Sequence, residues 1–154
     1  TRWLSDWSSD VCSSDLVVKT NKAQNAFRIF LGLFLLMAGI GHLSWSRVEF
    51  LAQVPAWVPV EADMVVVLSG IAEILLGSSL VLLSRYRVLV GCAAALFFVL
   101  IFPGNISQYV TGTDAFGLNT DLARGIRLLF QPVLVVWALW STGAYKAWQI
   151  SKSA

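Results

Sequence analysis

Five polar side chains lie in or at the ends of four long apolar stretches, and these are the groups in the sequence that could do chemistry: His42, Glu73, Asn105, Arg127 and Gln131. A polar group that faces lipid is costly, so such residues turn inward, find partners and often mark a site. Together the five offer an imidazole, a carboxyl group, a guanidinium and two amides. We therefore expect an internal polar cluster, which either pairs its members structurally or takes part in a ligand or proton site.

Glu73 is the most informative of the five. It stands nine residues into its apolar stretch, about 14 Å below the membrane boundary at 1.5 Å per residue, which is close to the midplane. A carboxyl group at that depth is either protonated or paired with a cation. Arg127 either turns inward to Glu73 or extends to the interface. We expect it inward, with the Glu73–Arg127 pair at the centre of the cluster, and whether that pair is structural or part of a site stays open.

The other three polar positions fall toward the same side of the membrane. His42 ends the first stretch, and a single histidine there is more typical of a hydrogen-bonded helix terminus than of a metal or haem ligand, so we expect no metal site. Pro103, Gly104 and Asn105 are expected to end the third helix, with Asn105 capping carbonyls or donating into the pocket. Gln131 shares a helical face with Arg127. The pattern predicts a polar pocket that opens outward above an apolar plug.

The apolar stretches that must position these residues run roughly over 26–43, 64–83, 88–106 and 126–144. Each is long enough to cross a hydrocarbon core about 30 Å thick as a helix. A hydrophobic content of 57% and a mean hydropathy of +0.72 exclude an ordinary soluble domain. The expected fold class is all-α: an integral membrane four-helix transmembrane bundle. Ser69, Gly70 and Gly77 lie on the Glu73 face and should let a neighbouring helix approach closely.

The first sixteen residues differ from the rest of the chain. Back-translation of residues 6–16, DWSSDVCSSDL, resembles a short-read sequencing adapter over its whole length, so we exclude 1–16 as a non-native segment and treat 17–154 as the domain. The native chain is then expected to start near Val17 or upstream. Without Arg2, Asp6, Asp10 and Asp15 the formal charge rises from +2 to +4. Cys12 also falls in this segment, which leaves Cys92 as a small packing residue and excludes dithiol chemistry for this chain alone.

The connections indicate how the chain sits in the membrane. The loop of residues 44–63 has an apolar rhythm, two tryptophans and two prolines, which predicts a short interfacial helix between the first and second spans. With four spans, seven basic residues fall on one side and only Arg47, Arg124 and Arg127 on the other. The seven are Lys19, Lys22, Arg28, Arg85, Arg87, Lys146 and Lys152. The positive-inside rule then predicts that both termini are cytoplasmic.

Five short motifs, in order, resemble those of the DoxX-like family of small four-span bacterial membrane proteins. They are RIFLGLFLLMAGIGHLSWSRVEF from Arg28, VPAWVP from Val54, SGIAEILLG from Ser69, FPGNI from Phe102 and RLLFQPVLVVW from Arg127. The resemblance implies a four-helix transmembrane bundle in the bacterial cytoplasmic membrane, with His42, Glu73, Asn105, Arg127 and Gln131 as the recurrent polar core. It also implies a link to thiosulfate–quinone oxidoreduction and to complexes of oxidative-stress defence.

Two functions remain open at this point. The first is an accessory membrane subunit of a quinone-linked redox or oxidative-stress complex, without catalytic activity of its own, for which quinone is the candidate cofactor. The alternative is a protein that binds or transports a small molecule or lipid through the outward pocket. A standalone enzyme is a third, less favoured reading, because no cofactor-binding motif or dithiol is present in the sequence. The expected partners are the lipid bilayer, membrane oxidoreductase subunits or a second copy of the chain, and not nucleic acid.

Overall fold

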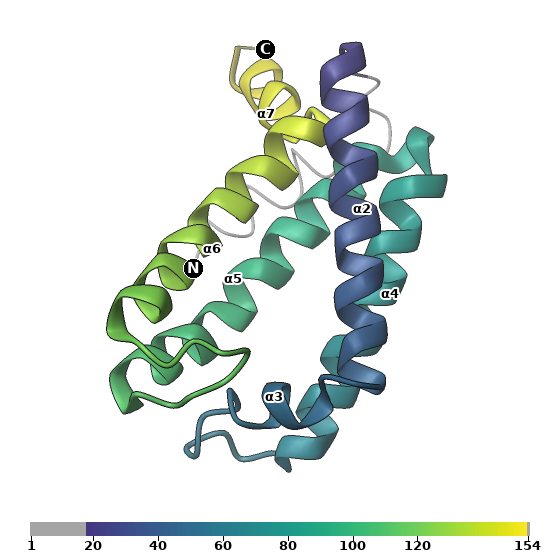
Figure 1. Cartoon of the computed structure of the whole chain (residues 1–154). Coiled ribbons are helices and arrows are strands. Elements are labelled where there is room, and N and C mark those ends of the chain that lie inside the picture. Colours follow the sequence, from purple (N-terminus) through teal and green to yellow (C-terminus); the bar gives the residue numbers. More distant parts are fainter. Residues whose placement is uncertain (1–17, 154) are drawn as a thin grey trace.

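The computed structural model describes residues 18–153, which are helices and their connections. The adapter-like segment lies outside the described residues. Figure 1 shows the elements in order, and their bounds are α2 Lys22–Leu43, α3 Arg47–Leu51, α4 Ala62–Leu82, η1 Ser84–Tyr86, α5 Arg87–Thr111, α6 Asp121–Thr142 and α7 Ala144–Ser153. The all-α prediction is confirmed, and so is the short helix between the first two spans, which is α3.

Four of these helices are long and apolar enough to cross a membrane: α2, α4, α5 and α6. They coincide with the four apolar stretches of the sequence and carry many exposed large apolar side chains, such as Met37, Leu75 and Val136. In water such a surface would be unfavourable, whereas in a bilayer it is the expected surface. The chain is a small multi-span membrane protein, and the lipid bilayer is its implied environment.

The helices form two antiparallel hairpins. α2 packs along α4, and α5 packs along α6, whereas α4 and α5 touch only slightly. The two hairpins lie close together at the end that carries η1 and α7, here called the terminal end. They diverge toward the opposite end, here called the loop end, where α3 lies between them (Figure 1). A space between the hairpins at the loop end follows from this arrangement.

Glycines bring the backbones of α2 and α4 into contact. A Cβ atom on Gly77 would stand 2.6 Å from the Gly32 carbonyl oxygen, and one on Gly39 would stand 2.7 Å from the Gly70 carbonyl oxygen. Real Cβ atoms do not approach backbone oxygens so closely, so any larger residue would push the helices apart. The expectation that Gly70 and Gly77 allow close approach is confirmed. Arg28 adds to this hairpin, because its guanidinium donates to the Leu80 carbonyl in the last turn of α4.

Apolar packing fills the terminal half of the bundle. Its buried core residues come from all four spans and are Leu31, Leu35, Leu80, Val90, Ala94, Ala95, Phe98, Leu134 and Ala138. A smaller cluster joins α5 to α7 and includes Cys92, which is buried there as a packing residue. Helix α7 was not anticipated from the sequence. It follows Gly143, whose left-handed conformation (φ 79°) ends α6 and turns the chain.

The expected end of the third span is wrong. α5 continues through Pro103 and Asn105 as far as Thr111, and Gly112 caps it in the left-handed conformation (φ 65°). Pro103 removes the N–H that would bond to the Val99 carbonyl, yet a membrane helix tolerates this when other groups satisfy the backbone nearby. Next to this position, Gln131 of α6 links the two helices, because its Nε2 donates to the Phe98 carbonyl at 2.7 Å.

Candidate functional site

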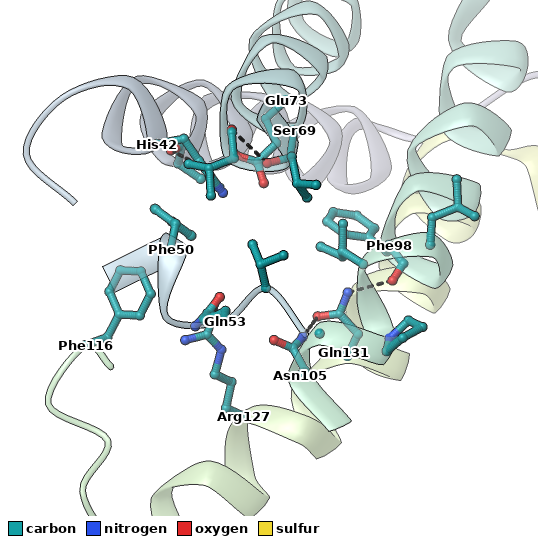
Figure 2. Close-up of a pocket in the computed structure, with 18 of the residues that line it drawn as sticks. His42, Phe50, Gln53, Ser69, Glu73, Phe98, Asn105, Phe116, Arg127 and Gln131 are labelled. Carbon is teal, nitrogen blue, oxygen red and sulfur yellow. Dashed lines mark hydrogen bonds and ion pairs between the residues drawn. The ribbon is translucent and has the colours of Figure 1, made fainter. Parts of the chain in front are cut away.

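A cavity of about 690 Å³ occupies the loop end between the two hairpins. All five polar residues singled out in the sequence line it: His42, Glu73, Asn105, Arg127 and Gln131. Most of the remaining lining is apolar, including Phe34, Leu35, Val66, Phe98 and Leu134. Figure 2 shows His42 and Glu73 on one side of the cavity and Asn105, Gln131 and Arg127 on the other. The structure thus brings the five residues to one cavity, above the apolar core of the terminal half.

His42 and Glu73 form the wall contributed by the α2–α4 hairpin. The nearest atoms are His42 Nδ1 and Glu73 Oε2, which are 2.8 Å apart, and both side chains are less than a tenth exposed. They meet because α2 and α4 are in backbone contact here: a Cβ on Gly70, one turn before Glu73, would stand 2.8 Å from the His42 Cβ. Ser69 lines the cavity beside them.

The imidazole of His42 has a second neighbour. Nδ1 is also aligned with the Ala38 carbonyl oxygen at 3.0 Å. Carbonyl and carboxylate oxygens accept, so a proton on Nδ1 has two acceptors beside it, the Ala38 carbonyl oxygen and Glu73 Oε2. Glu73 Oε2 is then close to the imidazole but is fully buried without an aligned hydrogen bond to any described residue. A buried acceptor in this position costs roughly 1–3 kcal/mol unless a donor reaches it.

Asn105 and Gln131 form a brace within the α5–α6 hairpin. Asn105 Nδ2 donates to Gln131 Oε1 at 2.9 Å, while Gln131 Nε2 donates to the Phe98 carbonyl. Both side chains are buried. Asn105 therefore neither caps a helix end nor stands at the rim, because α5 continues beyond it. Its amide instead holds Gln131 in place against α5.

Arg127 does not pair with Glu73, which corrects the expected centre of the cluster. Within residues 18–153 the acid–base contact of Glu73 is with His42, and no carboxylate lies within ion-pair distance of Arg127. Arg127 Nη2 donates instead to Gln53 Oε1 at 3.0 Å, and its guanidinium lies over the Phe116 ring, 4.9 Å from the centroid. The two side chains lie on opposite sides of the cavity (Figure 2). Lying in the same half of the bundle did not make them neighbours.

Two loops cover the cavity at the loop end, and we call their contacting residues the cover: Glu49, Phe50, Gln53 and Phe116. Phe50 stacks on His42 with ring planes 17° apart and meets Phe116 edge to face. The Phe116 backbone N–H donates to Glu49 Oε2 at 2.5 Å. These contacts join the 44–61 loop, on the α2–α4 hairpin, to the 112–120 loop, on the α5–α6 hairpin.

Sequence reasoning missed the cover. The available signals were weak, because the loop of residues 44–63 is predicted to lie at the interface and no motif in the sequence brings it against Phe116. Phe116 and Gly117 both adopt positive φ angles (55° and 70°), and only the glycine signals this in the sequence.

Ion pairs outside the cavity fix the loops to the helices. Arg47 of α3 makes three hydrogen bonds to the Asp63 carboxylate at 2.6–2.9 Å. These bonds, with the attraction of the carboxylate, raise the pKa of Arg47 above its ordinary value. Arg124 is buried and pairs with Asp114 and Asp121. Among the described residues, no group of His, Cys, Asp and Glu side chains is placed to hold a metal ion.

The cavity reaches the lipid-facing surface as well. Several lining residues are strongly exposed on the outside of the helices: Leu100 is 67% exposed, Ile126 60%, Phe34 46% and Phe130 45%. They belong to α2, α5 and α6, so parts of the cavity wall are formed by residues that also face the outside of the bundle. A molecule dissolved in the bilayer could reach the cavity there without passing the cover.

Comparison with known proteins gives a family but no function. No curated protein and no solved structure matches the chain. Residues 31–142, which include all four spans in whole or in large part and every polar residue of the cavity, match a family described as Domain of unknown function (DUF8561). The chain therefore belongs to this family, as a small multi-span membrane protein.

Proposed function

We propose that the protein binds one small lipophilic molecule with a polar head in the cavity at the loop end. The observation that carries this proposal is a largely apolar cavity whose walls hold the buried His42–Glu73 pair and Arg127, which has no carboxylate within ion-pair distance among the described residues. Such an arrangement is costly for stability alone and is useful when a ligand supplies the missing polar partner.

The size and the lining of the cavity support the same proposal. A volume of about 690 Å³ lies within the range of about 300–1,000 Å³ that is typical of small-molecule sites, where a few polar groups orient a ligand among apolar walls. The exposed edge residues Leu100 and Phe130 give access from the bilayer. Binding, or binding followed by transport, uses every one of these features.

Purification in a mild detergent followed by native mass spectrometry tests the proposal. The expected result is a small lipophilic molecule that remains with the wild-type protein. Ala38→Phe places a ring in the cavity that Ala38 lines and should abolish retention. Met37→Phe, on the exposed face of the same helix, is the matched control and should retain the molecule. Equal retention by both variants, or none by the wild type with lipid extract added back, would refute the proposal.

An accessory subunit of a quinone-linked redox or oxidative-stress complex is the second candidate. The observation that favours it is the presence of hydrogen-bonding groups on opposite walls, His42 and Glu73 on one and Arg127 and Asn105 on the other. This arrangement suits a flat ring with an oxygen at each side, as in a quinone. The resemblance of the sequence motifs to the DoxX-like family supports the same assignment and the bacterial cytoplasmic membrane. Oxidoreductase subunits in the native purification would favour this candidate, whereas a homo-oligomer that carries the ligand alone would favour the first.

Both candidate functions imply the same orientation of the chain in the membrane. We propose cytoplasmic termini and a cavity that faces the periplasm, on the basis of the seven basic residues at the terminal end and the three at the loop end. Alkaline phosphatase fused after Asp114 should be active, and the same enzyme fused after Arg87 should be inactive. The reverse pattern would invert the assignment.

A further inference from the structure

We propose that the cavity selects a lipophilic acid, whose anionic head binds Arg127 in place of the Gln53 side chain while its hydrocarbon part lies among the apolar walls. This inference rests on the proposed function and adds the chemical class of the ligand. It follows from the charges at the cavity, the contacts of Arg127 and its position along the bundle.

The charge that lacks compensation in the cavity is positive. Among the described residues that line it, the ionisable side chains are those of His42, Glu73 and Arg127. Glu73 has the imidazole of His42 at 2.8 Å, whereas Arg127 has no carboxylate within ion-pair distance in the described chain. An arginine at an apolar wall within a membrane span is costly without a counter-ion. An anionic ligand would supply that counter-ion.

Gln53 marks the position that the head would take. Its neutral amide oxygen accepts from Arg127 Nη2 at 3.0 Å, and its Nε2 donates to Gln108 Oε1 at 3.2 Å. A carboxylate in the place of that oxygen adds a negative charge opposite the guanidinium and can bind it through two parallel hydrogen bonds. Gln53 lies on a loop outside the helices, so it can withdraw when a ligand arrives.

Position along the bundle separates Arg127 from Glu73. Arg127 is in the second turn of α6, near the loop end, whereas Glu73 is in the middle of α4. An amphiphile that moves from one leaflet into the cavity keeps its head near the membrane surface and its chain toward the centre. The head therefore meets Arg127, and the chain extends toward Phe98 and Leu134, which line the deep end.

A matched set of twelve-carbon probes tests the inference. Radiolabelled dodecanoic acid is bound to the purified full chain in phosphatidylcholine nanodiscs at pH 8.5, and unlabelled dodecanoic acid, dodecanol and dodecylamine compete with it. We expect the acid to compete at least about tenfold better than the alcohol, which corresponds to 1.4 kcal/mol. The amine should compete least, because Arg127 repels it.

Substitutions locate the head. R127Q should weaken binding of the acid at least about tenfold, and R127K should recover part of it, which shows that the protein still folds. Q53A should strengthen binding because it frees Arg127, and E73Q should strengthen it because it removes a negative charge facing the cavity. R47Q is the matched control, since Arg47 is an arginine at the same end that pairs with Asp63 outside the cavity, and it should leave binding unchanged.

The possible outcomes distinguish a failure of this inference from a failure of the proposed function. Preferential competition by dodecylamine, with loss of binding in E73Q, would overturn the proposal that the ligand is an acid. It would indicate that the same cavity binds a cationic ligand. Equal weakening by R127Q and R47Q would also overturn it, because a general surface charge effect would then explain the result. Absence of all probe binding, together with no molecule retained in the native purification, would refute the proposed function itself.

Discussion

The terminal half and the loop half of the bundle are built from the same four helices but are packed in opposite ways. In the terminal half Gly32 and Gly77 bring α2 against α4, and Leu31 and Leu80 are fully buried in a shared core. In the loop half α2 and α4 remain in contact through Gly39 and Gly70, yet the two hairpins diverge around a cavity. The space therefore lies between hairpins and not within one, so each hairpin can stay intact whatever the cavity holds.

The largest effect is expected when a methyl group is added where the backbones of α2 and α4 are in contact. Gly77→Ala would place a Cβ 2.6 Å from the Gly32 carbonyl oxygen and should lower the free energy of unfolding by about 1–3 kcal/mol, the usual cost of overpacking. Gly125→Ala is the matched control in α6, where the nearest atom would be 3.6 Å away in the Tyr109 ring. That variant should be neutral or slightly more stable, because alanine favours helix.

Reversible unfolding in detergent measures the free energy of unfolding of both variants. Equal destabilisation by the two variants would mean that the glycines of α2 and α4 do not set the spacing of the hairpin. A stable Gly77→Ala protein with an unchanged cavity would lead to the same conclusion.

Smaller effects should distinguish the polar contacts across the loop half. A double-mutant cycle on His42→Ala and Glu73→Gln should show a coupling free energy of about 0.5 kcal/mol or more, because residues in contact are not additive. The cycle on Glu73→Gln and Arg127→Gln should be additive within about 0.5 kcal/mol, because they lie on opposite walls. Thermal unfolding in detergent supplies both cycles. Coupling in the second cycle and additivity in the first would restore the pair that the sequence had suggested.

Much of the architecture could be predicted from hydropathy and length. The four spans, α3 and the close approach at Gly70 and Gly77 all follow from apolar runs and small residues, which need only local information. The same holds for the gathering of polar side chains toward one end, because depth in a membrane follows from counting residues along each span. Asn105 and Gln131 were placed in the right region on these grounds.

Partners within the site could not be predicted in this way. Depth says nothing about the direction in which a side chain points around its helix or about which helices are neighbours. His42 reaches Glu73 because backbone contact at Gly70 brings α2 and α4 together, while Arg127 belongs to the other hairpin. Gln53 and Phe116 lie on loops, where no periodic pattern fixes position. The continuation of α5 past Pro103 was also missed, because a proline followed by a glycine usually signals a helix end and yet is tolerated within a membrane helix.

The bridge between Glu49 and the Phe116 backbone has a mechanical consequence. The two hairpins are packed firmly at the terminal end, which acts as a pivot, and the bridge joins them again at their far ends, here called the tips. A helix such as α2, with 22 residues, is about 33 Å long, so a rotation of about 5° at the pivot moves the tips by about 3 Å. Loss of this hydrogen bond together with the Phe50–Phe116 contact and the bonds of Gln53 to Gln108 and Arg127 would thus release a displacement large enough to change the width of the cavity, while the pivot itself scarcely moves.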